Sequence, residues 1–177
     1  MIRLFDIFFS FLGLFFLFPI LIILWIIGLL ENGSPLYKQV RVGINQNYFL
    51  LVKFRTMKKN TLSVATHLID DKAITTYGNF LRRTKLDEIP QLFNVLLGDM
   101  SLVGPRPCLS NQRRLIIERK KRGVFKVRPG ITGLAQISGI NMKTPILLSK
   151  TDLKMIKKIN LFYYFYYIFR TILQIIK

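Results

Sequence analysis

The residues best suited to chemistry lie between Arg82 and Pro107, in the segment RRTKLDEIPQLFNVLLGDMSLVGPRP. The chain has only nine acidic residues, yet Asp87, Glu88 and Asp99 all fall in this segment, beside several arginines and lysines. Two adjacent carboxylates surrounded by cations suit a site that handles phosphate together with a divalent cation. The segment is therefore the first candidate for an active site.

The local pattern predicts how these carboxylates are held. Apolar residues recur at helical spacing within Ile89–Leu96, so Asp87 and Glu88 are expected to open an amphipathic helix. Pro90 is tolerated in the first turn of such a helix, and Gly98 fits the position just past its end. A simpler interpretation also holds at this stage: Asp87 caps the helix and Glu88 interacts with its dipole, with no catalytic role.

A long apolar segment precedes this region. Residues 7–30 carry no charge, and the run is longer than the roughly 20 residues that cross a bilayer core. Pro19, in its middle, predicts a kink. The segment is then either a bent transmembrane span or a re-entrant hairpin that returns to the same face. Arg3 and Asp6 precede it, one helical turn apart and near enough to pair.

Charge and hydrophobicity are segregated along the chain. The sequence is 51% hydrophobic but has a net charge of +18, and Arg3 and Asp6 are the only charged residues among the first thirty. A basic body behind an apolar leader predicts an anionic partner, either nucleic acid or a membrane surface with phosphorylated ligands. Cys108 is the single cysteine, which is consistent with a reducing compartment. The 177 residues suit one domain.

Two short strands are predicted in LYKQVRVG and NYFLLVKFRTM, around a turn at residues 43–47. Alternation places Lys53 and Arg55 on one face of the second strand, where two cations could bind a diphosphate or simply face solvent. Residues 58–77 are polar and irregular, and the lone His67 among them receives no role. A short helix is expected over residues 78–85.

The remaining half is basic and ends in an aromatic segment. Residues 111–122 predict a basic helix that could lie against anionic lipid headgroups. The RPGITG turn is expected to bring Arg128, Pro129 and Gly130 to the site as a cradle for a nucleotide diphosphate. Residues 161–176 are rich in tyrosine and too short for a comfortable span, so they predict an interfacial helix.

Three blocks together resemble a known family. LDEIPQLFNVLLGDMSLVGPRP closely resembles the signature of bacterial sugar transferases, the monotopic polyprenyl-phosphate phosphoglycosyl transferases. VRPGITGLAQISG and KFRTM are similar to two further blocks of that family, so the resemblance covers nearly the whole chain. It implies an α/β fold that is mainly helical with a few short strands. It also implies a membrane helix over residues 1–31 that is a hairpin broken at Pro19, a cytoplasmic catalytic body over 32–160 and an interfacial helix over 161–177.

The resemblance also implies a reaction. The chain is expected to transfer a sugar-1-phosphate from a UDP-sugar to polyprenyl phosphate at the cytoplasmic face of the bacterial inner membrane, releasing UMP and beginning polysaccharide or glycoconjugate assembly. Asp87 would be the nucleophile, and Glu88, with Asp87, would bind Mg²⁺ or Mn²⁺. The expected phosphate-binding cations are Lys53, Arg55, Arg82 and Arg106.

Two departures from the family pattern affect substrate recognition. Ile140 stands where members commonly have a basic residue, and the tail has tyrosines where an acidic residue is usual. The chain is expected to be the minimal catalytic form of the family. Two other classes remain: a non-enzymatic membrane-anchored protein whose basic body binds nucleic acid or anionic lipid, and a phosphatase acting on the lipid carrier.

Overall fold

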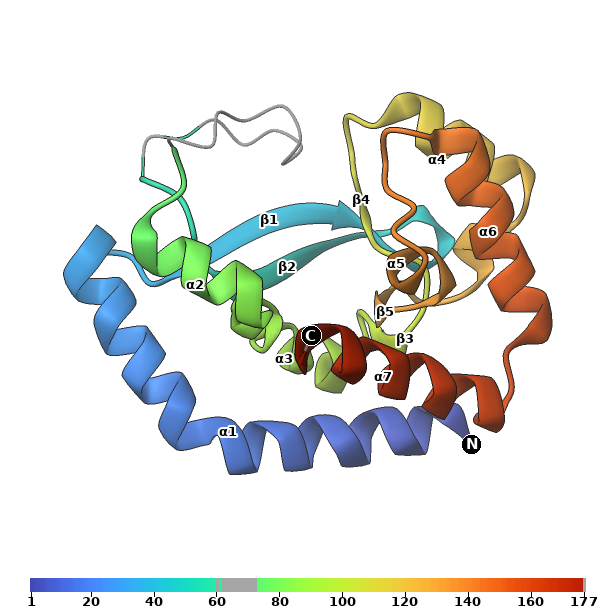
Figure 1. The fold of residues 1–177 in the computed structure, drawn as a ribbon. Coiled ribbons are helices and arrows are strands. Elements are labelled where there is room, and N and C mark those ends of the chain that lie inside the picture. Colours follow the sequence, from blue (N-terminus) through green and yellow to red (C-terminus); the bar gives the residue numbers. More distant parts are fainter. Residues whose placement is uncertain (60, 62–72, 177) are drawn as a thin grey trace.

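The computed structural model describes residues 1–59, 61 and 73–176, so His67 and most of the irregular segment around it lie outside the described residues. The described chain is mostly helical, with two small sheets and one long apolar helix at its N-terminus (Figure 1). This confirms the coarse fold class expected from the sequence.

Helix α1 (Ile2–Asn32) is one continuous helix that bends, rather than two helices joined by a turn (Figure 1). Pro19 lies inside it and has no N–H to donate to the carbonyl of Phe15, which accounts for a bend there. Gly33 ends the helix in the left-handed conformation, with φ 64°. Each limb buries a few residues four apart: Asp6, Ser10 and Leu14 before the bend, Leu24 and Gly28 after it.

The two predicted strands form the larger sheet. β1 (Leu36–Val42) pairs antiparallel with β2 (Tyr48–Phe54) across a short 3-10 turn, η1 (Ile44–Gln46). β4 (Cys108–Leu109) pairs with the other edge of β1. A second, two-stranded parallel sheet joins β3 (Ser101–Val103) to β5 (Gly130–Thr132). Because β1 is central, it brings β2 and the chain after residue 104 to one place.

The region of the two carboxylates differs from its prediction. Helix α2 (Thr76–Thr84) forms, and Gly98 follows α3 (Gln91–Leu97) with φ 93°, both as expected. Asp87 and Glu88, however, do not open α3, because they lie in a separate 3-10 turn, η4 (Leu86–Glu88). Lys85, just before that turn, adopts the left-handed backbone conformation with φ 58° and so interrupts the helical run. Pro90 is the N-cap residue of α3.

The second half of the chain is helical. It contains α4 (Arg113–Lys121), η5 (Val124–Lys126), α5 (Leu134–Ile137), α6 (Pro145–Lys158) and α7 (Leu161–Ile176). Figure 1 shows α1, α3 and α7 along one edge of the molecule and α4 at the opposite edge. The basic helix expected from the sequence therefore exists, but it lies on the side away from the apolar helix α1.

Helix α7 is anchored through its tyrosines and presents apolar side chains outward. Tyr164 and Tyr167 are buried, whereas Phe162 and Phe169 are exposed. Tyr164 donates its hydroxyl proton to Asp6 Oδ1 of α1 at 2.9 Å. The two buried tyrosines therefore hold α7 against the N-terminus of the chain.

The expected pair between Arg3 and Asp6 does not form among the described ion pairs. Arg3 donates to the carbonyls of Val95 and Leu96, at 2.6 and 3.1 Å, where α3 ends. Asp6 accepts hydrogen bonds from Ser101 and Leu102 of β3, as well as from Tyr164. Each of the two charges therefore fixes the start of α1 to a different part of the body.

Candidate active site

The two adjacent carboxylates occupy different environments. Asp87 is buried, with 7% of its surface exposed, and neither it nor Glu88 caps a helix through its side chain. Glu88 Oε1 accepts a hydrogen bond from Arg106 Nη2 at 2.6 Å, across a separation of 18 residues. The helix-cap interpretation of Asp87 therefore has no support in the geometry.

The ionisation of the pair follows from these environments. Burial, reinforced by Glu88, raises the pKa of Asp87 to about 6 against the opposing charges of Lys53, Arg106 and Lys85. Burial would also raise the pKa of Glu88, but Arg106 and the two lysines outweigh it and hold that pKa below its ordinary value. At neutral pH both groups are mainly ionised, and Asp87 is the more basic of the two.

A pocket of about 510 Å³ lies beside this pair. The three cations that act on Asp87, namely Lys53, Lys85 and Arg106, all line it. Burial lowers the pKa of Lys53 to about 8, helped by Arg106, Arg41 and Arg82 and opposed by Asp87. Its ammonium group is therefore charged at neutral pH and loses its proton more readily than an exposed lysine.

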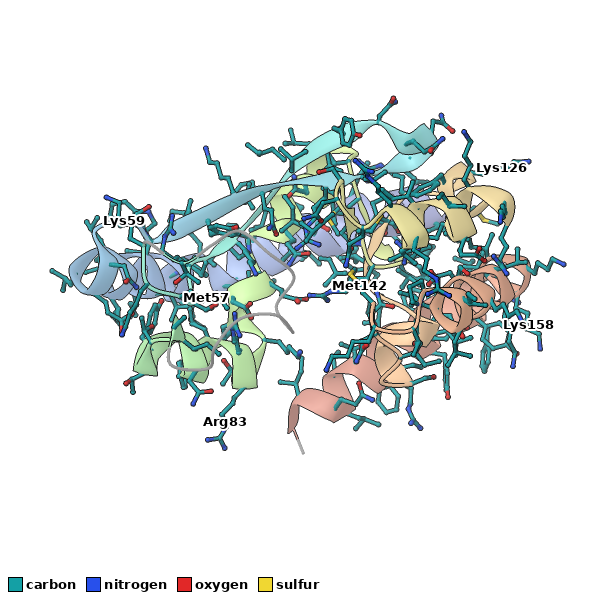
Figure 2. The ribbon with its side chains drawn as sticks, turned by 90° about the horizontal axis from the view of Figure 1, so that it is seen from above. Met57, Lys59, Arg83, Lys126, Met142 and Lys158 are labelled. Carbon is teal, nitrogen blue, oxygen red and sulfur yellow. The ribbon has the colours of Figure 1, made fainter. Side chains whose placement is uncertain are left out.

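The opposite wall of the pocket comes from the chain after β5. Gln136, Ile140, Asn141 and Lys143 line it, so the family departure at Ile140 is placed in the pocket itself. Figure 2 shows Met142, another lining residue, in the middle of the molecule between α2 on one side and α5 and α6 on the other. This wall therefore faces the cations across the volume where a substrate would lie.

Arg41 is a pocket residue that the sequence reasoning missed. It lines the pocket from β1, and it donates to the carbonyl of Pro107 and to Gln39 Oε1. Its Nε is buried and has no hydrogen-bond partner, while burial and then Arg106 lower its pKa to about 10. Alternation in β1 would have supplied a signal, since the register Tyr37↔Lys53 places residues 37, 39 and 41 on the face of Lys53.

Two other predicted cations do not line the pocket. Arg55 shares a face with Lys53, as predicted, and both lie over the ring of Tyr37, at 5.4 and 5.6 Å from its centroid. Arg55 also donates to the carbonyls of Ser34 and Leu36, so it secures the turn after α1. Arg82 donates to Thr56 Oγ1 and acts on Lys53 through its charge from behind the pocket.

The residues predicted to form a nucleotide cradle lie outside this pocket. Arg128 donates to the carbonyl of Gly98 at 2.8 Å, and the Pro129 carbonyl accepts from Ser101 N–H. Gly130 approaches Gly104 so closely that a Cβ on it would lie 1.9 Å from the Gly104 nitrogen. These residues do not line the pocket. Their strand, β5, instead pairs with β3, which leads into the segment that carries Arg106.

A buried ion pair also supports Arg106. Arg119 of α4 and Asp152 of α6 are both about 1% exposed, and Arg119 Nη2 lies 2.8 Å from Asp152 Oδ2. Arg119 Nη1 donates to the carbonyl of Arg106 at 2.8 Å. The backbone that presents Arg106 to Glu88 is therefore fixed by two helices distant in the sequence.

The donor set suits a hydrated hard cation. Within the described ranges, no three His, Cys, Asp or Glu side chains gather in one place. Asp87 and Glu88 supply carboxylate oxygens beside a cation-lined pocket, and Mg²⁺ commonly keeps several waters and needs only one or two carboxylates together with substrate phosphates. The residues present thus fit Mg²⁺ or Mn²⁺, and they do not resemble a zinc site.

Comparisons with known proteins place the chain in a family. The sequence model of the family described as bacterial sugar transferase matches residues 1–177. The chain is 48% identical over 113 residues to an uncharacterized sugar transferase, EpsL, of Bacillus subtilis (strain 168), and 40% identical over 159 residues to the undecaprenyl-phosphate galactose phosphotransferase of Salmonella typhimurium. It is 43% identical over 126 residues to the UDP-glucose:undecaprenyl-phosphate glucose-1-phosphate transferase of Escherichia coli (strain K12).

These similarities cover most of the chain but less of each relative. The matched regions take in 63%, 78% and 68% of this chain, in the same order. They take in 55%, 33% and 27% of the relatives. The chain therefore spans between about a quarter and a half of the length of these three relatives.

Proposed function

Because the chain belongs to the bacterial sugar transferase family, we propose that it transfers a sugar-1-phosphate from a UDP-sugar to polyprenyl phosphate and releases UMP. The Salmonella relative is an undecaprenyl-phosphate galactose phosphotransferase, and the Escherichia relative is a UDP-glucose:undecaprenyl-phosphate glucose-1-phosphate transferase. The observation that carries the proposal is the buried Asp87 beside a pocket lined by Lys53, Lys85 and Arg106. Membership of a transferase family argues against the alternative of a non-enzymatic protein that binds nucleic acid.

In the first step, Asp87 attacks the phosphorus next to the sugar. A bond forms between a carboxylate oxygen and phosphorus while the bond from phosphorus to the UMP oxygen breaks, and UMP leaves with that electron pair. Lys53, Arg106 and Arg41 stabilise the charge on the phosphoryl oxygens and the leaving group. A bound Mg²⁺ or Mn²⁺ would add further neutralisation of the phosphates.

In the second step, an oxygen of polyprenyl phosphate attacks the same phosphorus. The bond to Asp87 breaks, the carboxylate is restored, and a polyprenyl-diphosphate sugar results. The raised pKa of Asp87 makes its carboxylate a better nucleophile than an ordinary aspartate while leaving it largely ionised at neutral pH. Glu88, held by Arg106, is the weaker base and suits cation binding.

We further propose that α1 is re-entrant and that the single catalytic body lies at the cytoplasmic face of the inner membrane. Both limbs of α1 pack on this body: Asp6 bonds to β3, and the carbonyl of Leu24 accepts from Tyr77 of α2 at 2.6 Å. Helices α3 and α7 lie at the same edge as α1 (Figure 1), and they carry exposed apolar residues, among them Phe93, Leu97 and Phe169. A helix held at both ends by one body dips into the bilayer more readily than it crosses it.

The direct test is to incubate the membrane-reconstituted protein with undecaprenyl phosphate and a panel of nucleotide sugars while measuring nucleoside monophosphate release. Continued UMP formation, beyond one equivalent per enzyme, that depends on both substrates, stops with a chelator and returns with Mg²⁺ supports the proposal. Release of inorganic phosphate from the lipid alone would identify a phosphatase instead.

A substitution at Asp87 tests the covalent step. Asp87→Asn removes the attacking charge at nearly constant size, so turnover should fall by about 10³-fold or more while the thermal unfolding temperature stays near that of the wild type. Glu88→Gln is the matched control, and its loss should be partly rescued by excess Mg²⁺. An Asp87→Asn protein with substantial turnover would remove Asp87 from the mechanism.

A further inference from the structure

A second pocket, of about 290 Å³, lies on the other side of the segment that carries Arg106. Gly104 and Pro105 line this pocket, whereas the next residue, Arg106, lines the active-site pocket. The start of α1, β3, η5 and the end of α6 enclose it, at the end of the molecule where α1 begins and α7 follows α6 (Figure 1). Neither the proposed reaction nor the sequence reasoning gives it an occupant.

The lining of this second pocket is amphipathic. Ile2, Met155 and Ile159 are among its apolar residues, and Arg3, Lys126 and Arg128 are its cations. Asp6 is its one acidic residue, so three cations stand against a single carboxylate in the lining. The pocket therefore has an apolar interior with an excess of positive charge.

Two of these cations are held in place by the end of α3. Arg3 donates to the carbonyls of Val95 and Leu96, and Arg128 donates through Nε to the carbonyl of Gly98. The C-terminal end of a helix favours cations, so both guanidinium groups are stabilised there. The terminal nitrogens of Arg128 take no part in that bond, and Lys126 lines the same pocket. Figure 2 shows Lys126 projecting from the same end of the molecule as Lys158.

We propose that this second pocket binds a glycerophospholipid with an anionic headgroup, such as phosphatidylglycerol. Arginine and lysine recognise the phosphate, and the apolar walls take the adjacent methylenes. Ile2 and Arg3 of α1 and Ile159, which lies just before α7, line the pocket, so it adjoins two of the helices that face the bilayer in the proposed topology. This lipid site replaces α4 as the place of contact with anionic lipid, because α4 lies at the opposite edge of the molecule.

Binding can be measured without turnover, so the test does not depend on the proposed reaction. The purified full chain in a zwitterionic detergent is titrated with short-chain phosphatidylglycerol, and the shift in thermal unfolding temperature gives an apparent Kd. The double variant Lys126→Gln/Arg128→Gln should weaken that Kd at least 10-fold. The matched double variant Arg113→Gln/Arg114→Gln, on exposed positions of α4, loses the same charge and should bind as the wild type.

A second variant, Ile156→Trp, fills the pocket without changing charge and should also weaken binding, which separates the pocket from general electrostatics. Equal binding of phosphatidylcholine would overturn the proposal, as would equal loss in the α4 variant. Competition by inorganic phosphate as strong as that by the lipid would reduce the pocket to a simple anion site, and a clear preference for polyprenyl phosphate would assign it to the acceptor. Either result also overturns it.

Discussion

At the scale of residues, two adjacent carboxylates differ in pKa because their surroundings differ. Asp87 is buried and has a raised pKa, while Glu88 is held by Arg106 and has a lowered one. Two groups of the same chemistry thereby become suited to different tasks, nucleophilic attack and cation binding. Burial also affects the cations of the pocket, because it disfavours the charged form of Lys53 and lowers its pKa.

This balance predicts a bell-shaped pH profile for kcat/KM. Activity should rise as pH increases through about 6, because Asp87 must lose its proton to attack. It should fall as pH increases through about 8, because Lys53 then loses the charge that stabilises the phosphates. The measurement is UMP release across this range. The Lys53→Arg variant should shift only the descending limb to higher pH, and a profile without an ascending limb near pH 6 would contradict the role of Asp87.

Arg41 should contribute to phosphate binding although it lies outside the signature segment. Arg41→Met removes a buried guanidinium with an unpartnered Nε, and kcat/KM for the nucleotide sugar should fall by about 100-fold. Arg41→Lys keeps the charge and should recover part of the loss. Steady-state kinetics with varied donor check the effect, and Arg113→Gln on exposed α4 is the control. If Arg41→Met showed wild-type kinetics, Arg41 would have only a structural role in the sheet and none in phosphate binding.

At the scale of elements, α1 is joined to the body through buried polar groups. Asp6 Oδ1 accepts from the Ser101 hydroxyl, the Leu102 N–H and the Tyr164 hydroxyl, each at 2.9 Å, and so connects α1, β3 and α7. Asp6 is 2% exposed, so these three donors have little access to water as a replacement partner. One carboxylate thus fixes the packing of three elements that are distant in the sequence.

Removing this acceptor should destabilise the whole chain. Asp6→Ala leaves the donors of Ser101, Leu102 and Tyr164 without a partner, and the free energy of unfolding should fall by about 2–5 kcal/mol. Asp6→Asn keeps one acceptor oxygen and should cost less. Thermal unfolding in detergent measures both. If Asp6→Ala unfolded at the wild-type temperature, the hydrogen bonds of Asp6 would not hold α1 in place.

At the scale of the whole molecule, the active-site pocket and the long apolar helix α1 belong to one body. One proposed substrate is soluble in water and the other is a lipid, so the site must stand at the boundary between the two. The bend at Pro19 lets both limbs of α1 rest on one body, and α1, α3 and α7, which all carry exposed apolar residues, lie along one edge (Figure 1). In the proposed topology this edge faces the bilayer.

Cysteine labelling tests this placement. In a Cys108→Ser background, Leu4→Cys lies in the first turn of α1 and Lys38→Cys lies in β1 after its end, both at exposed positions. Both should react with a membrane-impermeant maleimide in inverted vesicles only. Phe16→Cys, near the bend, should be protected in either orientation. Labelling of Leu4→Cys and Lys38→Cys from opposite sides would establish a transmembrane span and reject the re-entrant arrangement.

The sequence by itself determined the local features of this protein. The apolar run predicted α1 and Pro19 its bend, alternation predicted β1 and β2, and the aromatic tail predicted α7. These features depend on neighbouring residues through periodicity and backbone restriction, which a single sequence contains. The acidic pair was likewise found because a rare residue type is concentrated among cations.

Only the tertiary structure decided which side chains meet. Arg41 enters the pocket because β1 lies between β2 and β4, whereas Arg128 turns to Gly98 because β5 pairs with β3. Asp6 finds Tyr164 at a separation of 158 residues. Such contacts depend on how distant elements pack, and local propensity carries no information on that packing. The same residue types could have met in other combinations without altering any helix or strand.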